Sequence, residues 1–330
     1  MTLEDVAAAA GVSRATASRV LNGVSTVRPA AARAVRAAAT ELGYRPNLAA
    51  RSLARGRSDS IGLVLTERDL AALLHSFFAQ PLRGATAAVT RRSLQLVLLL
   101  AGPDEDSLRR YLDGSHVDGA LVILEAHSTN LPRVLGNSAV PVVYLGRPVD
   151  SAPDMHSYVD VDNYGGARLA TAALVEAGRT VIGTIAGPPD MGVAVDRVAG
   201  WRDVLAEHGM VAPPVAYGGF TADGGANAMA RLLAARPDLD GLFVASDIMA
   251  TGALRVLSAS GRRVPEDVSV VGYDDSILAR TANPPLTSVR QPLEEMGELM
   301  VEVLLQLIAD PGSGPVQRVL PAQLTRRESV

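Results

Sequence analysis

The chain has 330 residues, of which 48% are hydrophobic and 20% charged, and its net charge is −4. This length predicts two or three domains at about 100–200 residues each, and the composition excludes a disordered or low-complexity chain. The absence of Cys excludes disulfides and thiol catalysis. The apolar runs are shorter than the ~20 residues that a membrane helix needs, and the first residues lack a secretory leader. We therefore expect a globular, cytoplasmic protein with no membrane partner.

Positive charge is concentrated at one end of the chain. Residues 1–58 contain nine Arg and three acidic residues, a net charge of +6, so the remaining residues carry −10. A cationic module on an acidic body is typical of a protein whose first segment binds a polyanion such as DNA.

Residues 1–45 are predicted to form three short helices. Thr2 caps the first helix, Ser13 caps a second helix that starts at Arg14, and Pro29 begins the third. Two helices joined by a short Gly-containing turn match a helix-turn-helix motif, whose second helix lies in the major groove of DNA. An ordinary helical hairpin has the same spacing, but the charge of this segment favours DNA binding.

From Ile61 onward, apolar strand-like runs alternate with helical stretches. The expected strands are IGLVLT, LQLVLLL, GALVIL, VPVVYLG, VIGTIAG, GLFVAS and VSVVGYD, and the expected helices include 77–91, 164–177, 198–208 and 248–260. Near-continuous apolar strands between helices predict parallel sheets that are covered on both faces. About 270 residues of this pattern exceed one sheet of ordinary size, so we expect two α/β subdomains.

Several motifs resemble those of one known family. TLEDVAAAAGVSRATASRVLNG and ELGYRPNLAARSLARGRSDSIGLV resemble the N-terminal motifs of the LacI/GalR family of bacterial transcription factors. Downstream, DNYGGARLA, IAGPPD with DRVAGW, ASDIMATGAL, VPEDVSVVGYDDS and PPLTSVRQP resemble the core signatures of that family in the expected order. The likeness covers nearly the whole chain.

The resemblance implies an α/β protein with an N-terminal all-α helix-turn-helix head. It assigns residues 1–45 to the DNA-binding head, 46–59 to a hinge helix or linker, and 60–330 to an effector-binding and dimerisation core. The core is expected to be periplasmic-binding-protein-like, with two Rossmann-like subdomains. Their expected limits are about 60–158 with 288–316 for the first, and about 159–287 with 317–330 for the second.

The resemblance also implies a function. The protein is expected to be a repressor that binds a palindromic double-stranded DNA operator as a homodimer, at the bacterial nucleoid, under the control of a small-molecule effector in the cleft between the subdomains. The C-terminal residues lack the apolar heptads that tetramerise some relatives, so a dimer is expected.

Residues of the head acquire roles from the same resemblance. Arg14 and Ala15 match the two main specificity positions of the recognition helix, and Arg19 is a further candidate for base contact. Arg donates bidentately to guanine, whereas Ala offers only apolar contact, for instance to a thymine methyl group. Five residues match positions that contact phosphates and so fix register: Thr2, Ser13, Ser18, Asn22 and Tyr44.

PNLAARSL resembles the hinge helix of the family, in which a leucine wedges into the central minor groove. Leu53 matches that leucine, and an apolar wedge of this kind unstacks a base step and kinks the duplex. Asn47 and Arg51 are candidate contacts to the DNA backbone or minor groove beside it. A plain linker with an incidental Leu53 is the alternative, because the segment has few large apolar residues.

Candidate effector contacts lie in the core. Phe77, Phe78 and Phe220 match positions that face the cleft, although aromatic side chains more often pack in a core. Arg197 and Asp274 match a charged pair that hydrogen-bonds ligands, and Asp274 follows a strand at the edge where open α/β sheets bind ligands. Ser246 stands where many relatives carry Asn, and Arg147 is a weaker candidate. Aromatic faces with Arg and Asp partners suit a sugar, but a purine would fit the same residues.

Other functions are disfavoured. The five His lack metal-ligand spacing, and the chain has no GxSxG, Walker loop or GxGxxG after the first core strand, so we expect neither an enzyme nor a cofactor. A DNA-bending architectural protein without an effector would leave the cleft without a role. A solute-binding protein would have no use for residues 1–58.

Overall fold

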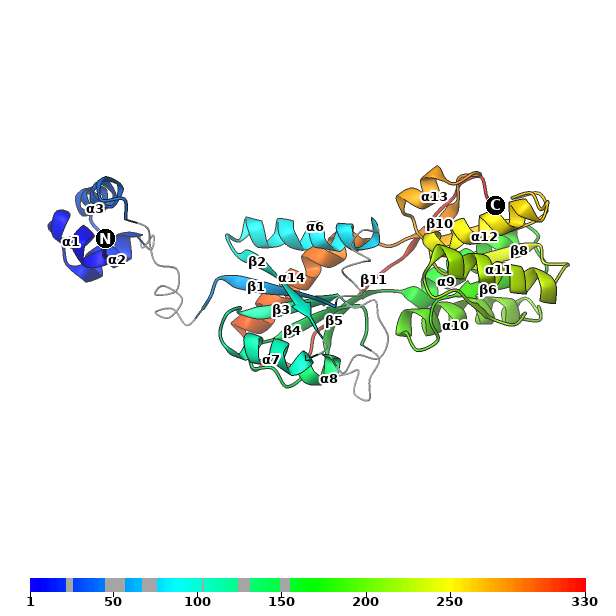
Figure 1. Ribbon diagram of the computed structural model, residues 1–330, viewed down its shortest axis with the longest axis horizontal. Helices are drawn as coiled ribbons and strands as arrows, with labels where there is room; N and C mark the ends of the chain where they lie inside the picture. The colour runs from blue at the N-terminus through cyan, green and yellow to red at the C-terminus, as the bar shows by residue number, and fades with distance from the viewer. Residues whose placement is uncertain (22–25, 45–56, 67–75, 103, 124–130, 149–154) are drawn as a thin grey trace. The chain divides into compact units, whose positions relative to one another are not determined.

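The computed structural model describes residues 1–21, 26–44, 57–66, 76–102, 104–123, 131–148 and 155–330, with the side chains of 66, 76 and 77 excepted (Figure 1). The chain divides into two compact units, Met1–Ser58 and Asp59–Val330. None of the described helices is long and apolar enough to cross a membrane.

The N-terminal unit contains the three helices that the sequence predicts: α1 (Leu3–Ala9), α2 (Arg14–Leu21) and α3 (Pro29–Glu41). The Thr2 hydroxyl accepts a hydrogen bond from the Asp5 amide, and the Asp5 carboxylate accepts one from the Thr2 amide, which completes the capping box. The helices enclose a small core that includes Val6, Ala17, Val20 and Val35. The four-residue connection between α1 and α2, residues 10–13, depends on Gly11, whose φ of 64° is costly for other residues.

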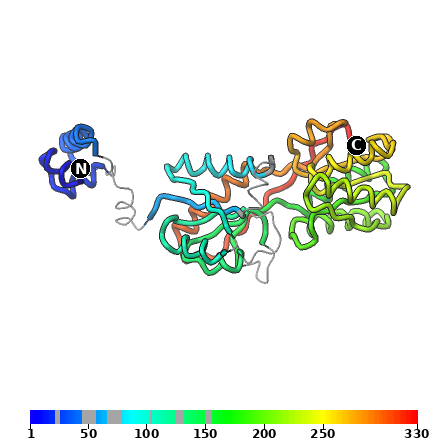
Figure 2. The backbone as a smooth tube through the Cα atoms, in the orientation of Figure 1, coloured from blue at the N-terminus to red at the C-terminus, as the bar shows by residue number. Residues whose placement is uncertain are grey.

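The C-terminal unit contains two six-stranded sheets, each with helices on both faces (Figures 1 and 2). The first sheet has the order β11-β5-β4-β3-β1-β2, and all its pairs are parallel. Its strands are β1 (Ser60–Thr66), β2 (Gln95–Ala101), β3 (Gly119–Ile123), β4 (Val142–Leu145), β5 (Ser157–Val161) and β11 (Gln317–Leu320). Its helices are α6 (Ser76–Arg91), α7 (Glu105–Asp113), α8 (Leu131–Leu135) and α14 (Leu293–Ala309). We call this sheet with its helices the first core half.

Alternation along β1 explains the two layers of the first core half. Ile61, Leu63 and Leu65 pack in the cluster that includes residues of α6 and α14, whereas Val64 packs with residues of α7 and α8 on the opposite face. Both faces of this strand are therefore buried, as parallel strands require.

The second sheet has the order β12-β10-β9-β8-β6-β7, and only the β10–β12 pair is antiparallel. Its strands are β6 (Ile182–Ala186), β7 (Ala216–Tyr217), β8 (Gly241–Val244), β9 (Ser269–Asp274), β10 (Thr287–Arg290) and β12 (Gln323–Thr325). Its helices are α9 (Asn163–Glu176), α10 (Gly192–Glu207), α11 (Ala222–Ala235), α12 (Asp247–Ala259) and α13 (Ile277–Thr281). We call this sheet with its helices the second core half.

The chain crosses between the halves three times: from β5 to α9, from β10 to α14, and from β11 to β12. These crossings correct the expected subdomain limits. Residue 158 falls inside β5 and 288 falls inside β10, and β11 pairs with β5 although it was expected in the second subdomain. Backbone pairing extends each strand a few residues past the limits that the sequence motifs suggested.

Other details also differ from the sequence prediction: β5, β7, β10, β11 and β12 were not among the expected strands. The helix expected from Val198 begins at Gly192. The sequence prediction started too late because Met191, the N-cap residue, makes no side-chain capping hydrogen bond and so gives no local signal. Strand β2 is not covered on both faces: Leu98 and Leu100 are 50% and 48% exposed at the edge of the first sheet.

Candidate functional site

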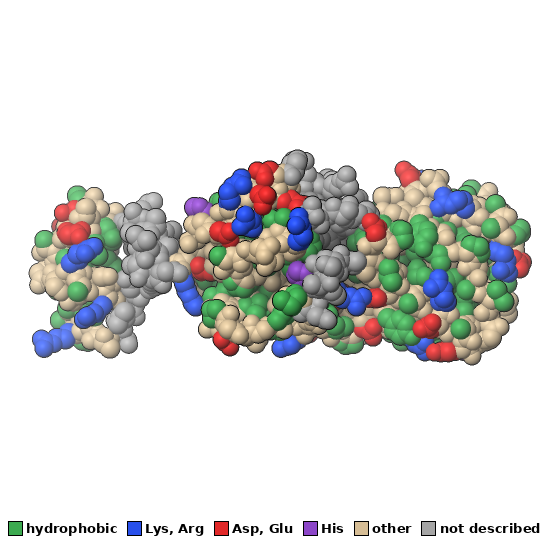
Figure 3. All heavy atoms as spheres, turned by 90° about the horizontal axis from the view of Figure 1, so that it is seen from below, with side chains coloured by type: hydrophobic (Ala, Val, Ile, Leu, Met, Phe, Trp, Pro, Cys, Tyr) green, Lys and Arg blue, Asp and Glu red, His purple; other side chains and the backbone are tan. Residues whose placement is uncertain are grey.

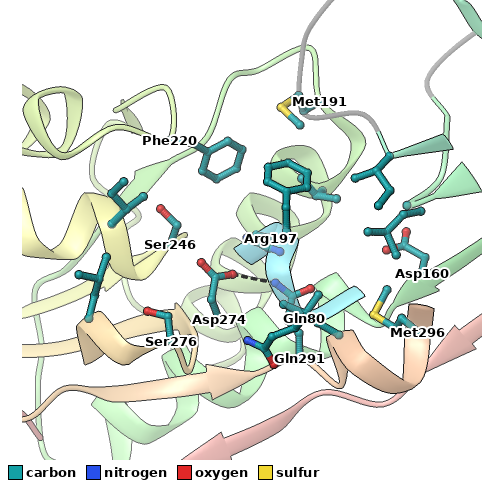
Figure 4. A pocket seen from close by; sticks show the side chains of 18 of the residues that line it. Gln80, Asp160, Met191, Arg197, Phe220, Ser246, Asp274, Ser276, Gln291 and Met296 are labelled. Atoms are coloured by element: carbon teal, nitrogen blue, oxygen red, sulfur yellow. Dashed lines mark hydrogen bonds between the residues drawn. The ribbon is translucent and has the colours of Figure 1, made fainter. Parts of the chain in front are cut away.

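A cavity of about 350 Å³ lies between the two core halves (Figure 4). It is lined at the carboxyl ends of parallel strands from both sheets, by Ile123 and Leu145 of the first half and by Ser246 and Asp274 of the second. Open α/β sheets bind ligands at this edge, because the loops there diverge and leave a crevice. The volume is in the range of small-molecule sites.

Arg197 lies at the floor of this cavity and is only 4% exposed. Its Nε donates to Asn163 Oδ1 at 2.9 Å, and its Nη1 donates to the carbonyl oxygen of Ala245 at 2.6 Å. Its guanidinium carbon lies 3.6 Å from the centre of the Tyr273 ring, a cation–π contact. The described residues offer no acceptor to Nη2, so this donor remains for a ligand.

Asp274 faces the same cavity from the end of β9. Its Oδ1 accepts a hydrogen bond of 2.7 Å from Nε2 of Gln291, which follows β10 (Figure 4). The φ of Asp274 is 112°, a strained conformation for a residue with a side chain. Strain of this kind is retained where the surrounding structure imposes it, often at functional sites.

Burial and the neighbouring Asp247 carboxylate raise the pKa of Asp274 to about 8, against the opposing effects of Arg197 and Gln291. Burial also raises the pKa of Asp247 to about 6, although Ser276 and Ser288 donate hydrogen bonds to its carboxylate. The floor of the cavity therefore contains a carboxyl group that is mainly protonated at neutral pH and can donate as well as accept hydrogen bonds.

Apolar side chains form the walls of the cavity. Phe78 of α6 is buried, and Phe220 packs its ring against Gly187, where a Cβ atom would lie 2.1 Å from the ring. Met191 and Met296 complete the wall on opposite sides (Figure 4). An apolar wall over a polar floor matches a ligand that has both a hydrophobic face and several hydroxyl groups.

The structure brings together five of the seven predicted effector contacts: Phe78, Arg197, Phe220, Ser246 and Asp274 line the cavity. Ser246 also caps α12, because its hydroxyl accepts a hydrogen bond from the Met249 amide. Phe77 lies in α6, but its side chain is outside the described residues. Arg147 does not line the cavity, and its guanidinium instead pairs with Asp196.

Sequence reasoning missed four polar residues of the cavity: Gln80, Asp160, Ser276 and Gln291. Burial raises the pKa of Asp160, against hydrogen bonds from the backbone amides of Val161 and Arg147. Asp160 lies near the end of β5, and Gln291 directly follows β10. A search for polar residues at strand ends would have found both.

In the N-terminal unit, the predicted base contacts share the exposed face of α2. Arg14, Ala15 and Arg19 are exposed and Ser18 is partly exposed, whereas Ala17 and Val20 are buried. At 100° per residue the four outward residues span an arc of about 140° on one side of the helix. Figure 3 shows Arg side chains that project from the described surface of this unit.

Only some of the remaining predicted DNA contacts lie within the described residues. Ser13 accepts a hydrogen bond from the Thr16 amide and caps α2, and Tyr44 packs against the small core of the unit. Arg14 pairs with Glu4 at 2.6 Å, but both side chains are exposed, so the pair is easily broken. The predicted contacts Asn22, Asn47, Arg51 and Leu53 lie outside the described residues.

Two family models match the sequence. Residues 2–47 match the model described as bacterial regulatory proteins, lacI family, and residues 171–330 match a periplasmic binding protein-like domain. The first range covers α1 to α3, and the second covers most of the second core half.

Individual relatives match the whole chain. The HTH-type transcriptional regulator CelR of Thermobifida fusca is 48% identical over 99% of this chain and 98% of its own length. The ribose operon repressor of Escherichia coli K12 is 34% identical over 94% of both chains. Among solved structures, a CelR–cellobiose complex matches with a TM-score of 0.79 at 46% identity over 100% of both chains. A lac repressor dimer bound to operator and the anti-inducer ONPF matches with a TM-score of 0.86 at 29% identity, over 100% of this chain and 98% of that one.

The raised pKa of Asp274 predicts how stability depends on pH. Between about pH 4 and pH 8 the unfolded carboxyl is ionised while the folded one remains largely protonated, so this group makes the wild type progressively less stable as pH rises. Asp274→Asn cannot ionise and can still accept the hydrogen bond from Gln291. We expect the melting temperature of Asp274→Asn minus that of wild type to increase by several degrees from pH 5 to pH 8.5, as measured by differential scanning fluorimetry.

Asp267→Asn is the matched control. Hydrogen bonds from Arg263 lower the pKa of Asp267 to about 2, so its contribution is constant over this range and is lost only in acid. An Asp274→Asn difference that is the same at pH 5 and pH 8.5 would contradict a raised pKa.

Proposed function

This chain belongs to the lacI family of bacterial regulatory proteins and is a DNA-binding transcriptional regulator, and we propose that it is a repressor controlled by a β-linked glucose disaccharide such as cellobiose. In this proposal the repressor binds a palindromic operator at the bacterial nucleoid. The observation that carries the effector assignment is the polar floor and apolar wall of the cavity between the core halves. The CelR relative supports the choice of sugar, because its structure is described as a cellobiose complex.

The cavity supports a sugar through the arrangement of its donors and acceptors. Arg197 offers Nη2, and Asp274 and Ser246 offer oxygen atoms at the same floor. Sugar hydroxyls both donate and accept hydrogen bonds, so they match this mixture, while the CH face of the ring packs on Phe78 or Phe220. A purine would use the same residues and is the alternative that the binding experiment decides.

The proposed dimer uses the exposed edge of the first sheet. Leu98 and Leu100 of the edge strand β2 are half exposed, and an apolar edge strand favours pairing with a second copy. A twofold dimer would present two copies of α2 to the two halves of a palindrome. The lac repressor neighbour supports this arrangement, because its structure is described as a dimer bound to operator.

The proposed regulation couples the cavity to the head. A ligand that contacts both core halves favours one relative angle between them, and β1, which follows the segment after the head, belongs to one of those halves. By linkage, the ligand can change operator affinity by at most the factor by which it prefers one state over the other.

The effector assignment is tested by isothermal titration of the full chain with cellobiose, ribose and guanine. We expect cellobiose to bind, and Arg197→Gln to weaken it at least tenfold, because a lost charge-assisted hydrogen bond costs about 1.5–3 kcal/mol. Arg255→Gln, an exposed arginine of α12, is the control that should leave affinity unchanged. Binding of guanine but not cellobiose would refute the sugar, and wild-type affinity in a folded Arg197→Gln would remove Arg197 from the site.

The recognition role of Arg14 predicts a change in base preference. Arg14→Ala should weaken operator binding by about 1–3 kcal/mol and relax the preference at one position in each half-site, as loss of a bidentate guanine contact requires. Arg33→Ala, an exposed arginine on α3, should leave base preference unchanged. Binding to a randomised operator library measures both. A uniform loss across all sequences would assign Arg14 to a phosphate contact.

The dimer surface predicts the effect of a charge on β2. Leu98→Glu places one carboxylate from each copy in the proposed interface, so we expect the dimer to dissociate at concentrations about tenfold or more higher than wild type in analytical ultracentrifugation. Val319→Glu is the control, since Val319 is 58% exposed on β11 at the opposite edge of the same sheet. A Leu98→Glu protein that dimerises like wild type would exclude this edge as the interface.

A further inference from the structure

One ion pair joins the two core halves outside the cavity. Arg147 follows β4 of the first half, and Asp196 lies on α10 of the second. Arg147 Nη2 lies 2.9 and 2.7 Å from the two carboxylate oxygens of Asp196. Arg147 is not among the residues that line the cavity, and neither is Asp196, so the pair stands beside the ligand site.

A chain of hydrogen bonds connects this pair to the floor of the cavity. The backbone amide of Arg147 donates to Asp160 Oδ2 at 3.2 Å. Asp160 Oδ1 accepts from Asn163 Nδ2 at 3.1 Å, and Asn163 Oδ1 accepts from Arg197 Nε at 2.9 Å. Because Asp196 and Arg197 are consecutive on α10, the contacts close into a ring that crosses between the halves twice.

The members of this ring differ in burial. Asp160, Asn163 and Arg197 are at least nine-tenths buried, whereas the side chains of Arg147 and Asp196 are 41% and 30% exposed. The inner crossing is therefore protected from water, and the outer ion pair lies at the rim. Separation of the halves would break the outer pair without leaving a buried charge behind, which makes it the reversible part of the ring.

We propose that Arg147 and Asp196 are positioning residues that hold the core halves together at the rim and thereby raise effector affinity without contacting the effector. The inference rests on the proposed role of the cavity as the effector site. A ligand that contacts both halves binds only when they are apposed, so its apparent affinity scales with the apposed fraction. The ion pair increases that fraction before the ligand arrives.

The size of the effect follows from the exposure of the pair. Partly exposed ion pairs contribute modestly, so breaking this one should shift the apposed fraction, and with it effector affinity, by about twofold to fivefold. The contribution should fall as salt rises, because the pair is accessible to counterions.

The first test uses the full chain without ligand. Hydrogen exchange is measured for peptides that cover the end of β4 and the first turns of α10, in wild type, Arg147→Gln, Asp196→Asn and the double variant. We expect exchange about twofold to fivefold faster in each single variant and no further increase in the double variant, because both changes remove the same contact. Unchanged exchange, or additive increases, would overturn the proposal whatever ligand the cavity binds.

Arg168→Gln is the matched control. Arg168 makes two hydrogen bonds of 2.8 Å to Glu207 of the same helix α10, but it lies on α9, within the second half. Its removal should leave exchange at the end of β4 as in wild type. A change as large as that of Arg147→Gln would show that α10 merely loses stability, which overturns the assignment.

The second test measures cellobiose binding by isothermal titration at low and high NaCl. Each single variant should bind about twofold to fivefold more weakly than wild type at low salt, the double variant should equal the singles, and the difference should shrink at high salt. Arg147→Lys should be intermediate, since it keeps the charge but not the guanidinium geometry. Equal affinity in wild type and variants would overturn the proposal. If wild type fails to bind cellobiose, the sugar assignment is wrong, and the exchange experiment still decides the role of the pair.

Discussion

The guanidinium of Arg197 is buried at the floor of the cleft, and a buried charge is unfavourable unless polar groups surround it. Three groups stabilise this cation: Asn163, the first residue of α9; the carbonyl oxygen of Ala245, which directly follows β8; and the ring of Tyr273 in β9. The cation is therefore fixed only when the second sheet and its helices are fully assembled. A ligand meets a donor that is already ordered, so little entropy is lost on binding.

Helix α10 connects ligand recognition to the relation between the halves. Arg197 points to the cavity floor, and the preceding residue, Asp196, pairs with Arg147 of the first half. In the proposed mechanism, the ligand and the Arg147–Asp196 ion pair favour the same apposed state of the two halves, and their contributions combine through a population shift rather than through direct contact.

The sequence predicted those helices and strands that have a local signal, such as an apolar run or a helix cap. The strand that contains Leu63 and the helix that begins at Arg14 were predicted correctly, because apolar runs and caps are local signals. Asp274 and Arg197, which both line the cavity, were named as candidates through family motifs, Asp274 at the end of β9 and Arg197 within α10. Arg147 was placed in the pocket although it pairs with Asp196, because sequence spacing cannot show which way a rim side chain turns. The limits near 158 and 317 failed for a related reason: pairing of β5 with β11 is a long-range contact.

In the proposed regulation the head and the cleft are thermodynamically coupled, and such coupling must be reciprocal. An operator duplex obtained by selection from random palindromes is titrated with and without saturating cellobiose, and cellobiose is titrated with and without saturating operator. We expect cellobiose to change operator affinity by about 5-fold to 150-fold, and operator to change cellobiose affinity by the same factor. Cellobiose affinity that is the same for the free and the operator-bound protein would contradict it.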